Sequence, residues 1–108
     1  MPTQQPDADA RTIERPDAAA TVLRLCVRNH PGVLSHVSGL FARRAFNVDG
    51  ILCLPIGDGT RSAILLLVRA DERLEQLVRQ LAKLEDVLEI RPEPGGQRAF
   101  AAVAAHLG

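Results

Sequence analysis

A short polar loop in front of an amphipathic segment is the best candidate for a binding site in this sequence. The loop reads Asn29-His30-Pro31-Gly32 and directly precedes apolar residues at helical spacing. The first backbone N–H groups of a helix have no intrahelical partner, and the helix dipole favours negative charge there, so a small carboxylate can bind. The side-chain carbonyl of Asn29 could accept a hydrogen bond from an ammonium group, and Gly32 permits close approach to the backbone. Together these groups would suit a free amino acid.

The same residues also have a simpler interpretation. Asn is among the best helix caps, so Asn29 could begin the helix, with Gly32 serving only the loop geometry. Asn47, beyond the other end of the helix, could be a left-handed residue that closes it. If a ligand does bind, Val33 and Leu34 would favour an aliphatic side chain. The residue types by themselves favour capping over a binding site.

Patterns for catalysis and metal binding are missing from the sequence. The three histidines, His30, His36 and His106, are not spaced as metal ligands. There is no Ser-His-Asp or Cys-His arrangement, no CxxC motif and no glycine-rich phosphate loop. Cys26 and Cys53 lie in apolar runs and are expected to be reduced, packed thiols. We therefore expect no catalytic residue, no metal and no cofactor in this chain.

Charge and composition argue against two further classes of function. The 108 residues carry 13 basic and 13 acidic side chains, so the formal net charge is zero, and the aromatic residues are three phenylalanines. Nucleic-acid binding needs a basic field, and single-strand binding also needs stacking platforms. No apolar run approaches the ~18 residues of a membrane span, and the N-terminus lacks a signal-peptide pattern. We expect a cytoplasmic protein that binds neither nucleic acid nor membrane.

Hydrophobic periodicity predicts the elements that position the loop. Alternating apolar residues indicate strands, and apolar residues three and four positions apart indicate helices. The GDGT sequence predicts a hairpin turn, and Asp71 is a plausible N-cap for the second helix. The expected order is strand, helix, strand, strand, helix and strand, over residues 21–28, 31–45, 48–56, 61–68, 72–85 and 87–91.

This order predicts an α+β, ferredoxin-like βαββαβ fold. Its four-stranded antiparallel sheet would carry two helices on one face, and we expect no cover from the chain on the other face. Alternate residues of the second and third strands would leave an apolar patch there, which predicts a second copy or another subunit against it.

The chain divides into one domain and two tails. Residues 21–92 form the expected domain, and residues 1–20 lack periodicity and predict a flexible N-terminal tail. Residues 93–108 predict a C-terminal tail that could form a short helix, since Phe100, Val103 and Leu107 lie at helical spacing. As an alternative to a second subunit, that tail could fold back over the open sheet face, and it is a possible docking element.

The run RNHPGVLSHVSGLFARRAFNVDGILCLPI, residues 28–56, resembles the ACT domain of acetolactate synthase (acetohydroxyacid synthase) regulatory small subunits of the short isozyme I type. With the later pattern LEQLVRQLAKLEDVLEI, the resemblance covers about residues 21–91. It implies a non-catalytic subunit that binds and activates a catalytic large subunit and confers feedback inhibition by valine. It also implies that thiamine diphosphate, magnesium and FAD are held by that catalytic subunit.

The resemblance further implies that two ACT domains pair and bind the amino acid where they meet. Carried over by position, the effector site comprises Asn29, Gly32, Val33 and Leu34 from the loop and helix start, with Asn47 from the partner domain. Since Asn29 and Asn47 lie near opposite ends of one helix, a single domain would struggle to place both on one small ligand. The resemblance therefore implies a homodimer.

Three other functions stay open on the sequence. A stand-alone amino-acid-sensing ACT protein would bind an effector without a catalytic partner. An RNA-binding ferredoxin-like domain is disfavoured by neutral charge and by the absence of an aromatic pair on the central strands. A small enzyme of this fold would need a base or nucleophile, and no convincing one is present.

Overall fold

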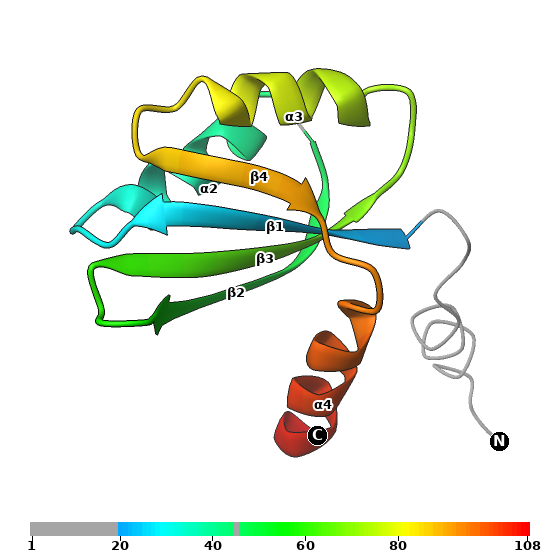
Figure 1. The fold of residues 1–108 in the computed structure, drawn as a ribbon. Coiled ribbons are helices and arrows are strands. Elements are labelled where there is room, and N and C mark those ends of the chain that lie inside the picture. Colours follow the sequence, from blue (N-terminus) through cyan, green and yellow to red (C-terminus); the bar gives the residue numbers. More distant parts are fainter. Residues whose placement is uncertain (1–19, 45) are drawn as a thin grey trace, which may run out of the picture.

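The computed structural model describes residues 20–44 and 46–108 (Figure 1). Along the described chain the elements are β1 (Ala20–Arg28), α2 (Val33–Arg43), β2 (Val48–Ile56), β3 (Arg61–Arg69), α3 (Leu74–Ala82), β4 (Val87–Pro92) and α4 (Gln97–Leu107). The flexible tail predicted for residues 1–20 lies outside the described residues, except for Ala20, where β1 begins. The first helix was expected to reach about Ala45, which also lies outside them, and α2 ends at Arg43.

The four strands form one antiparallel sheet in the order β2-β3-β1-β4, which confirms the predicted α+β, ferredoxin-like fold. β1 occupies the centre because it pairs with β3 along its whole length and with β4 on its other side. Two helices, α2 and α3, each connect strands that are consecutive along the chain but not adjacent in the sheet. They pack on the same face of the sheet (Figure 1).

The core lies between this face and the two helices. Alternate residues of the central strands point into it, including Leu25 opposite Ile64, both completely buried. From the helices, residues three or four positions apart complete it, with Val37 on α2 and Leu81 on α3 also inaccessible. Strand residues two positions apart and helix residues three or four positions apart therefore form one apolar layer between the sheet and the helices.

α4 covers part of the second sheet face, so the tail folds back as the alternative for residues 93–108 predicted, and the expectation of a face without cover from the chain is wrong. The C-terminal tail forms a full helix that leaves the sheet on the side opposite α2 and α3 (Figure 1). The ring of Phe100 lies against Gly50 on β2, and Gly96 packs on Val22 of β1. Each contact has a glycine on one side, Gly50 on the strand or Gly96 before the helix, so α4 approaches the sheet closely.

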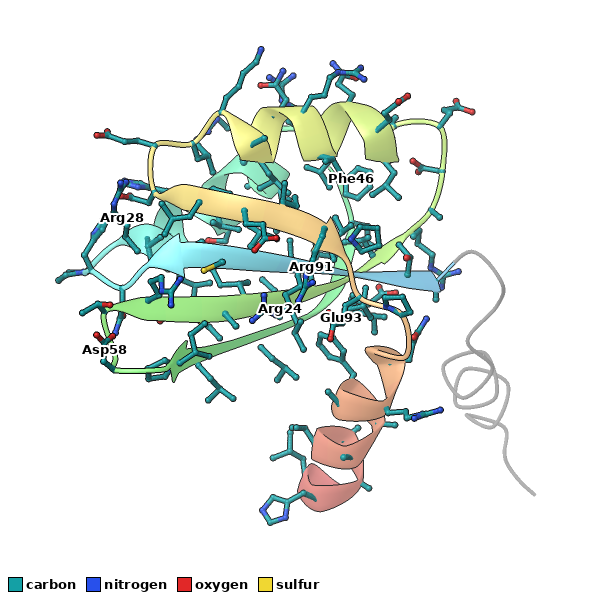
Figure 2. All side chains as sticks on the ribbon, in the orientation of Figure 1. Arg24, Arg28, Phe46, Asp58, Arg91 and Glu93 are labelled. Atoms are coloured by element: carbon teal, nitrogen blue, oxygen red, sulfur yellow. The ribbon has the colours of Figure 1, made fainter. Side chains whose placement is uncertain are left out.

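The rest of that face stays accessible. On β2, Leu54 is 66% exposed, and the neighbouring outward pair, Leu52 of β2 opposite Leu65 of β3, is half-buried. Towards the other edge, Arg24 of β1 and Arg91 of β4 lie opposite one another in register (Figure 2). The face is therefore apolar along β2 and β3 and carries charged side chains towards β4, while β1 also contributes the apolar Val22 and Cys26 to it.

Asp71 does not cap the second helix directly. Its carboxylate accepts a hydrogen bond from the N–H of Arg73 at 2.8 Å, and its carbonyl accepts one from Leu74. α3 begins at Leu74, with Arg73 at the N-cap position and no side-chain cap. Asp71 instead closes the turn that leads into the helix.

The contact between Gly50 and Phe100 yields a test of how α4 is held. A Cβ at residue 50 would lie 2.8 Å from the Phe100 ring, so Gly50→Ala forces the ring and its helix away from the sheet. We expect a loss of about 1 kcal/mol or more in the stability of α4 docking, typical of overpacking at a tight site. Native-state amide hydrogen exchange along α4 measures it.

Phe100→Ala provides the matched control for this prediction. Once the ring is removed, the added methyl group has nothing to displace, so the double variant should resemble Phe100→Ala alone. Additive losses in the two variants would show that Gly50 acts through some other contact.

Candidate ligand-binding loop

The β1–α2 loop, residues 29–32, is tied to the β2–β3 hairpin. The Asn29 side-chain amide donates a hydrogen bond to the Gly59 carbonyl at 2.8 Å, and the Asn29 backbone N–H donates to the Thr60 carbonyl at 3.0 Å. Gly59 adopts a positive φ of 91°, which few other residues tolerate. The Asp58 carboxylate accepts hydrogen bonds from the Thr60 hydroxyl and N–H, which hold the pKa of Asp58 below its ordinary value. The predicted GDGT turn is thus confirmed and positions the loop.

A second restraint comes from the turn between α3 and β4. The Arg28 N–H donates to the Asp86 carbonyl at 3.0 Å, and the Arg28 guanidinium donates to the Glu85 carbonyl at 3.1 Å. The Asp86 carboxylate in turn lies 2.5 Å from Nε2 of His30. Figure 2 shows Arg28 and Asp58 at the same end of the sheet, so both turns reach the loop there.

His30 contacts an acceptor through each of its ring nitrogens. Nε2 faces the Asp86 carboxylate, and Nδ1 lies 2.6 Å from the Pro31 carbonyl oxygen. The hydrogen bond to Asp86 is the main cause that raises the pKa of His30, the Pro31 carbonyl adds to it, and nearby Arg28 opposes it. The Asp86 oxygen also lies 3.8 Å from Nδ1 of His36, on the first turn of α2.

The start of α2 leaves backbone donors unpaired. Gly32 holds the N-cap position with a φ of 89° and makes no side-chain cap bond, so Asn29 is not the cap of this helix. The N–H groups of Val33 and His36 donate to the carbonyls of His30 and Gly32. Within the described chain, the N–H groups of Leu34 and Ser35 have no backbone acceptor. These two donors lie at the positive end of the helix dipole.

The remaining residues expected at the site are divided between the two ends of α2. Val33 is only 5% exposed and its side chain packs in the core, whereas Leu34 is 40% exposed beside the loop. Asn47 lies beyond the C-terminal end of the helix, where its amide donates to the Asp49 carboxylate at 3.5 Å. Asn29, Gly32 and Leu34 thus lie on the loop and the first turn of α2, and Asn47 lies beyond the other end of the same helix.

A cleft of about 200 Å³ lies away from the loop. It is lined by Arg44, Phe46, Arg73, Gln76 and Leu77. The Arg73 guanidinium lies 5.0 Å from the centre of the Phe46 ring, a cation–π contact between two of the lining side chains. This cleft shares no residue with the ligand-binding loop.

Other chemistry is sparse in the part of the chain that the structure describes. Among residues 20–44 and 46–108, no cluster of three histidine, cysteine or acidic side chains could hold a metal ion. None of the helices in these residues is long and apolar enough to cross a membrane. Cys26 is a buried free thiol and Cys53 a half-buried one, as predicted.

Sequence reasoning missed Asp86 and the Gly59 carbonyl as partners of the loop. Asp86 follows a run of helix residues and carries no spacing that relates it to His30. The only available signal was topological, since the predicted antiparallel order brings the hairpin and the start of the last strand to the same end as the loop.

Comparison with known proteins points to one family. A family model described as the AHAS (acetohydroxyacid synthase) small subunit-like ACT domain matches residues 23–89. The acetolactate synthase isozyme 1 small subunit of Escherichia coli K12 is 57% identical over 83 residues, which cover 77% of this chain and 86% of the relative. The isozyme 3 small subunit of the same organism is 39% identical over 70 residues, 64% of this chain and 43% of that longer relative.

Solved structures agree with this similarity. The small subunit of acetolactate synthase from Thermotoga maritima matches with a TM-score of 0.63 and 31% identity, over 72% of this chain and 50% of that one. The ACT domain of a GTP pyrophosphokinase from Chlorobium tepidum matches with a TM-score of 0.55 at 17% identity, over 68% of this chain and 96% of that one, and therefore supports the fold alone.

The raised pKa of His30 predicts how folding stability depends on pH. Since the folded-state value lies above the ordinary 6.5, the His30–Asp86 interaction stabilises the fold fully below that pH and is lost as the pH rises through the raised value. The difference in unfolding free energy between the native chain and Asp86→Asn should therefore be larger at about pH 6 than at about pH 8.5. Urea unfolding at both pH values measures it.

His106→Gln is the control, because His106 is exposed on α4 and should leave the pH profile unaltered. An equal loss for Asp86→Asn at both pH values would contradict the charge-assisted interaction.

Proposed function

Because the chain belongs to the AHAS small subunit-like ACT domain family, we propose that it is a regulatory subunit of acetolactate synthase. In this role it binds the catalytic large subunit, raises its activity and transmits feedback inhibition by valine. The observation that carries the proposal is the extent of the similarity to the isozyme 1 small subunit, which spans most of both chains. Thiamine diphosphate, magnesium and FAD would then be held by the catalytic subunit.

The ligand-binding loop supports an amino acid as the effector. The free N–H groups of Leu34 and Ser35 can donate to its carboxylate, and the helix dipole stabilises that negative charge. The Asn29 amide nitrogen is committed to Gly59, which leaves its carbonyl oxygen to accept from the ammonium group. Leu34 offers an exposed apolar surface to an aliphatic side chain.

Geometry favours a pocket shared between two copies. α2 has 11 residues, so its ends lie about 16 Å apart at 1.5 Å per residue. Valine is far shorter than this distance, so Asn29 and Asn47 of one chain cannot contact the same molecule. The proposal therefore places Asn47 of a partner subunit against the loop, in a homodimer of ACT domains.

A shared pocket gives valine a route to regulation. An effector that bridges two subunits binds more tightly to the pair geometry that completes the pocket, and it shifts the population towards that geometry. The shift in the catalytic subunit can be no larger than this difference in affinity, typically about 1–3 kcal/mol for coupled sites. Activation requires only that the regulatory subunit bind, so the two effects are separable.

Asn29→Ala should abolish valine inhibition and leave activation of the catalytic subunit largely intact. The substitution removes the acceptor for the ammonium group and the hydrogen bond that holds the loop to Gly59, and it leaves the sheet faces unaltered. Reconstitution with the catalytic subunit and titration with valine measures both effects. Inhibition at an unchanged valine concentration would show that the loop is not the site, and failure to bind any catalytic subunit would favour a stand-alone amino-acid sensor.

Mixing Asn29→Ala with Asn47→Ala tests the shared pocket directly. In a mixed dimer one pocket carries both substitutions and the other carries neither, so valine inhibition should partly return although each variant alone lacks it. Ser38→Ala, on α2 between the two ends, is the control and should respond to valine normally. If mixing restores nothing, each pocket lies within a single chain.

A further inference from the structure

We infer that His30 and Asp86 form a positioning pair for the effector loop. With His30 protonated, the pair holds the Pro31 carbonyl and the start of α2 in the form that receives the effector carboxylate. The inference rests on the proposed function for the identity of the ligand. Neither residue is expected to touch the effector.

Protonation follows from the surroundings of the His30 ring. Both of its nitrogens face oxygen acceptors, the Asp86 carboxylate at 2.5 Å and the Pro31 carbonyl at 2.6 Å. A neutral imidazole has one N–H, so either tautomer would turn a lone pair towards an oxygen. Only the imidazolium donates to both acceptors at once.

The contact with Pro31 links this proton to the effector site. In a regular helix the Pro31 carbonyl would accept from the Ser35 N–H, four residues along the chain. Here the carbonyl oxygen is engaged by Nδ1 of His30, and the Ser35 N–H has no backbone acceptor within the described chain. Protonated His30 therefore keeps a donor available for the carboxylate, and it adds positive charge beside the helix start.

The groups that face His30 on balance favour its protonated form. Asp86, on the α3–β4 turn, stabilises the imidazolium, while Arg28 at the end of β1 opposes it. His36 on α2 shares the same Asp86 oxygen at 3.8 Å, but it is well exposed and makes the longer contact. The carboxylate of Asp86 lies 2.5 Å from His30 and 3.8 Å from His36, so its charge acts mainly on His30.

Protonation of His30 and binding of the effector are then thermodynamically linked. If the imidazolium form binds the carboxylate better, affinity is greater below the pKa of His30 and falls as the pH rises through it. By reciprocity, the bound effector must raise the pKa of His30 further. A purely structural role for the pair would produce neither effect.

Calorimetric titration of the full chain with valine, from about pH 6 to about pH 8.5, tests the inference. We expect the native affinity to fall about fivefold or more over this range, a typical size for coupled sites. His30→Gln should bind weakly at every pH, with no such trend. His36→Gln and His106→Gln are the matched controls, and each should keep the native pH profile.

Asp86→Asn separates charge from shape, since an asparagine oxygen can still accept from Nε2. The pH at which affinity falls should move to lower values, because the imidazolium loses its counter-charge. An unchanged midpoint in Asp86→Asn, or a native trend in His30→Gln, overturns the inference.

Nuclear magnetic resonance titration of the histidine rings distinguishes failure of the inference from failure of the proposed function. The His30 signal, assigned from its loss in His30→Gln, should titrate above the ordinary range, shift upward with valine and shift downward in Asp86→Asn. No valine binding at any pH would refute the proposed effector. In that case a His30 signal at its ordinary position, insensitive to Asp86→Asn, would refute the positioning pair as well.

Discussion

The pairing of β1 with β3 is the constraint on which the rest of the structure depends. The two strands run antiparallel over nine residue pairs and end with Arg28 opposite Arg61. That register brings Asn29 beside the hairpin turn, because in an antiparallel pair the residue that follows β1 lies opposite the residue that precedes β3. On its other edge β1 pairs with β4, which brings Asp86 to the same place. A slip of one residue would turn Leu25 out of the core and would also dismantle the loop.

The two restraints on the loop differ in their physics. The hydrogen bond from Asn29 to Gly59 joins an amide to a backbone carbonyl, so it has the same strength at any physiological pH. The contact of His30 with Asp86 involves two groups whose charges depend on pH. The loop therefore has one constant restraint and one adjustable restraint. Such a division lets the strength of the site vary without loss of its shape.

The order of the main elements and the strand boundaries, to within one residue, followed from local patterns, because strand and helix periods are visible within ten residues. Both helices are two or three residues shorter at each end than their apolar patterns predicted. The relation between the loop and its supports was not visible in this way. Asn29 and Gly59 lie 30 positions apart, and Arg28 and Glu85 lie 57 apart, so these contacts exist only once the sheet is assembled. The cover given by α4 was predicted only as an alternative for a related reason. Gly50 shows its importance only when the Phe100 ring is placed against it.

The long sequence separation of the contacts around residues 28–30 also bears on the order of folding. Contacts between distant segments form late, since the chain must first lose the entropy of closing the intervening loop. The contacts of the loop region with the α3–β4 turn can form only after the last strand has joined the sheet. Partly folded chains therefore lack a formed site, and an effector would recognise only the completed domain. Ligand binding would then protect the whole sheet from unfolding, by a free energy that increases with the logarithm of the ligand concentration above its Kd.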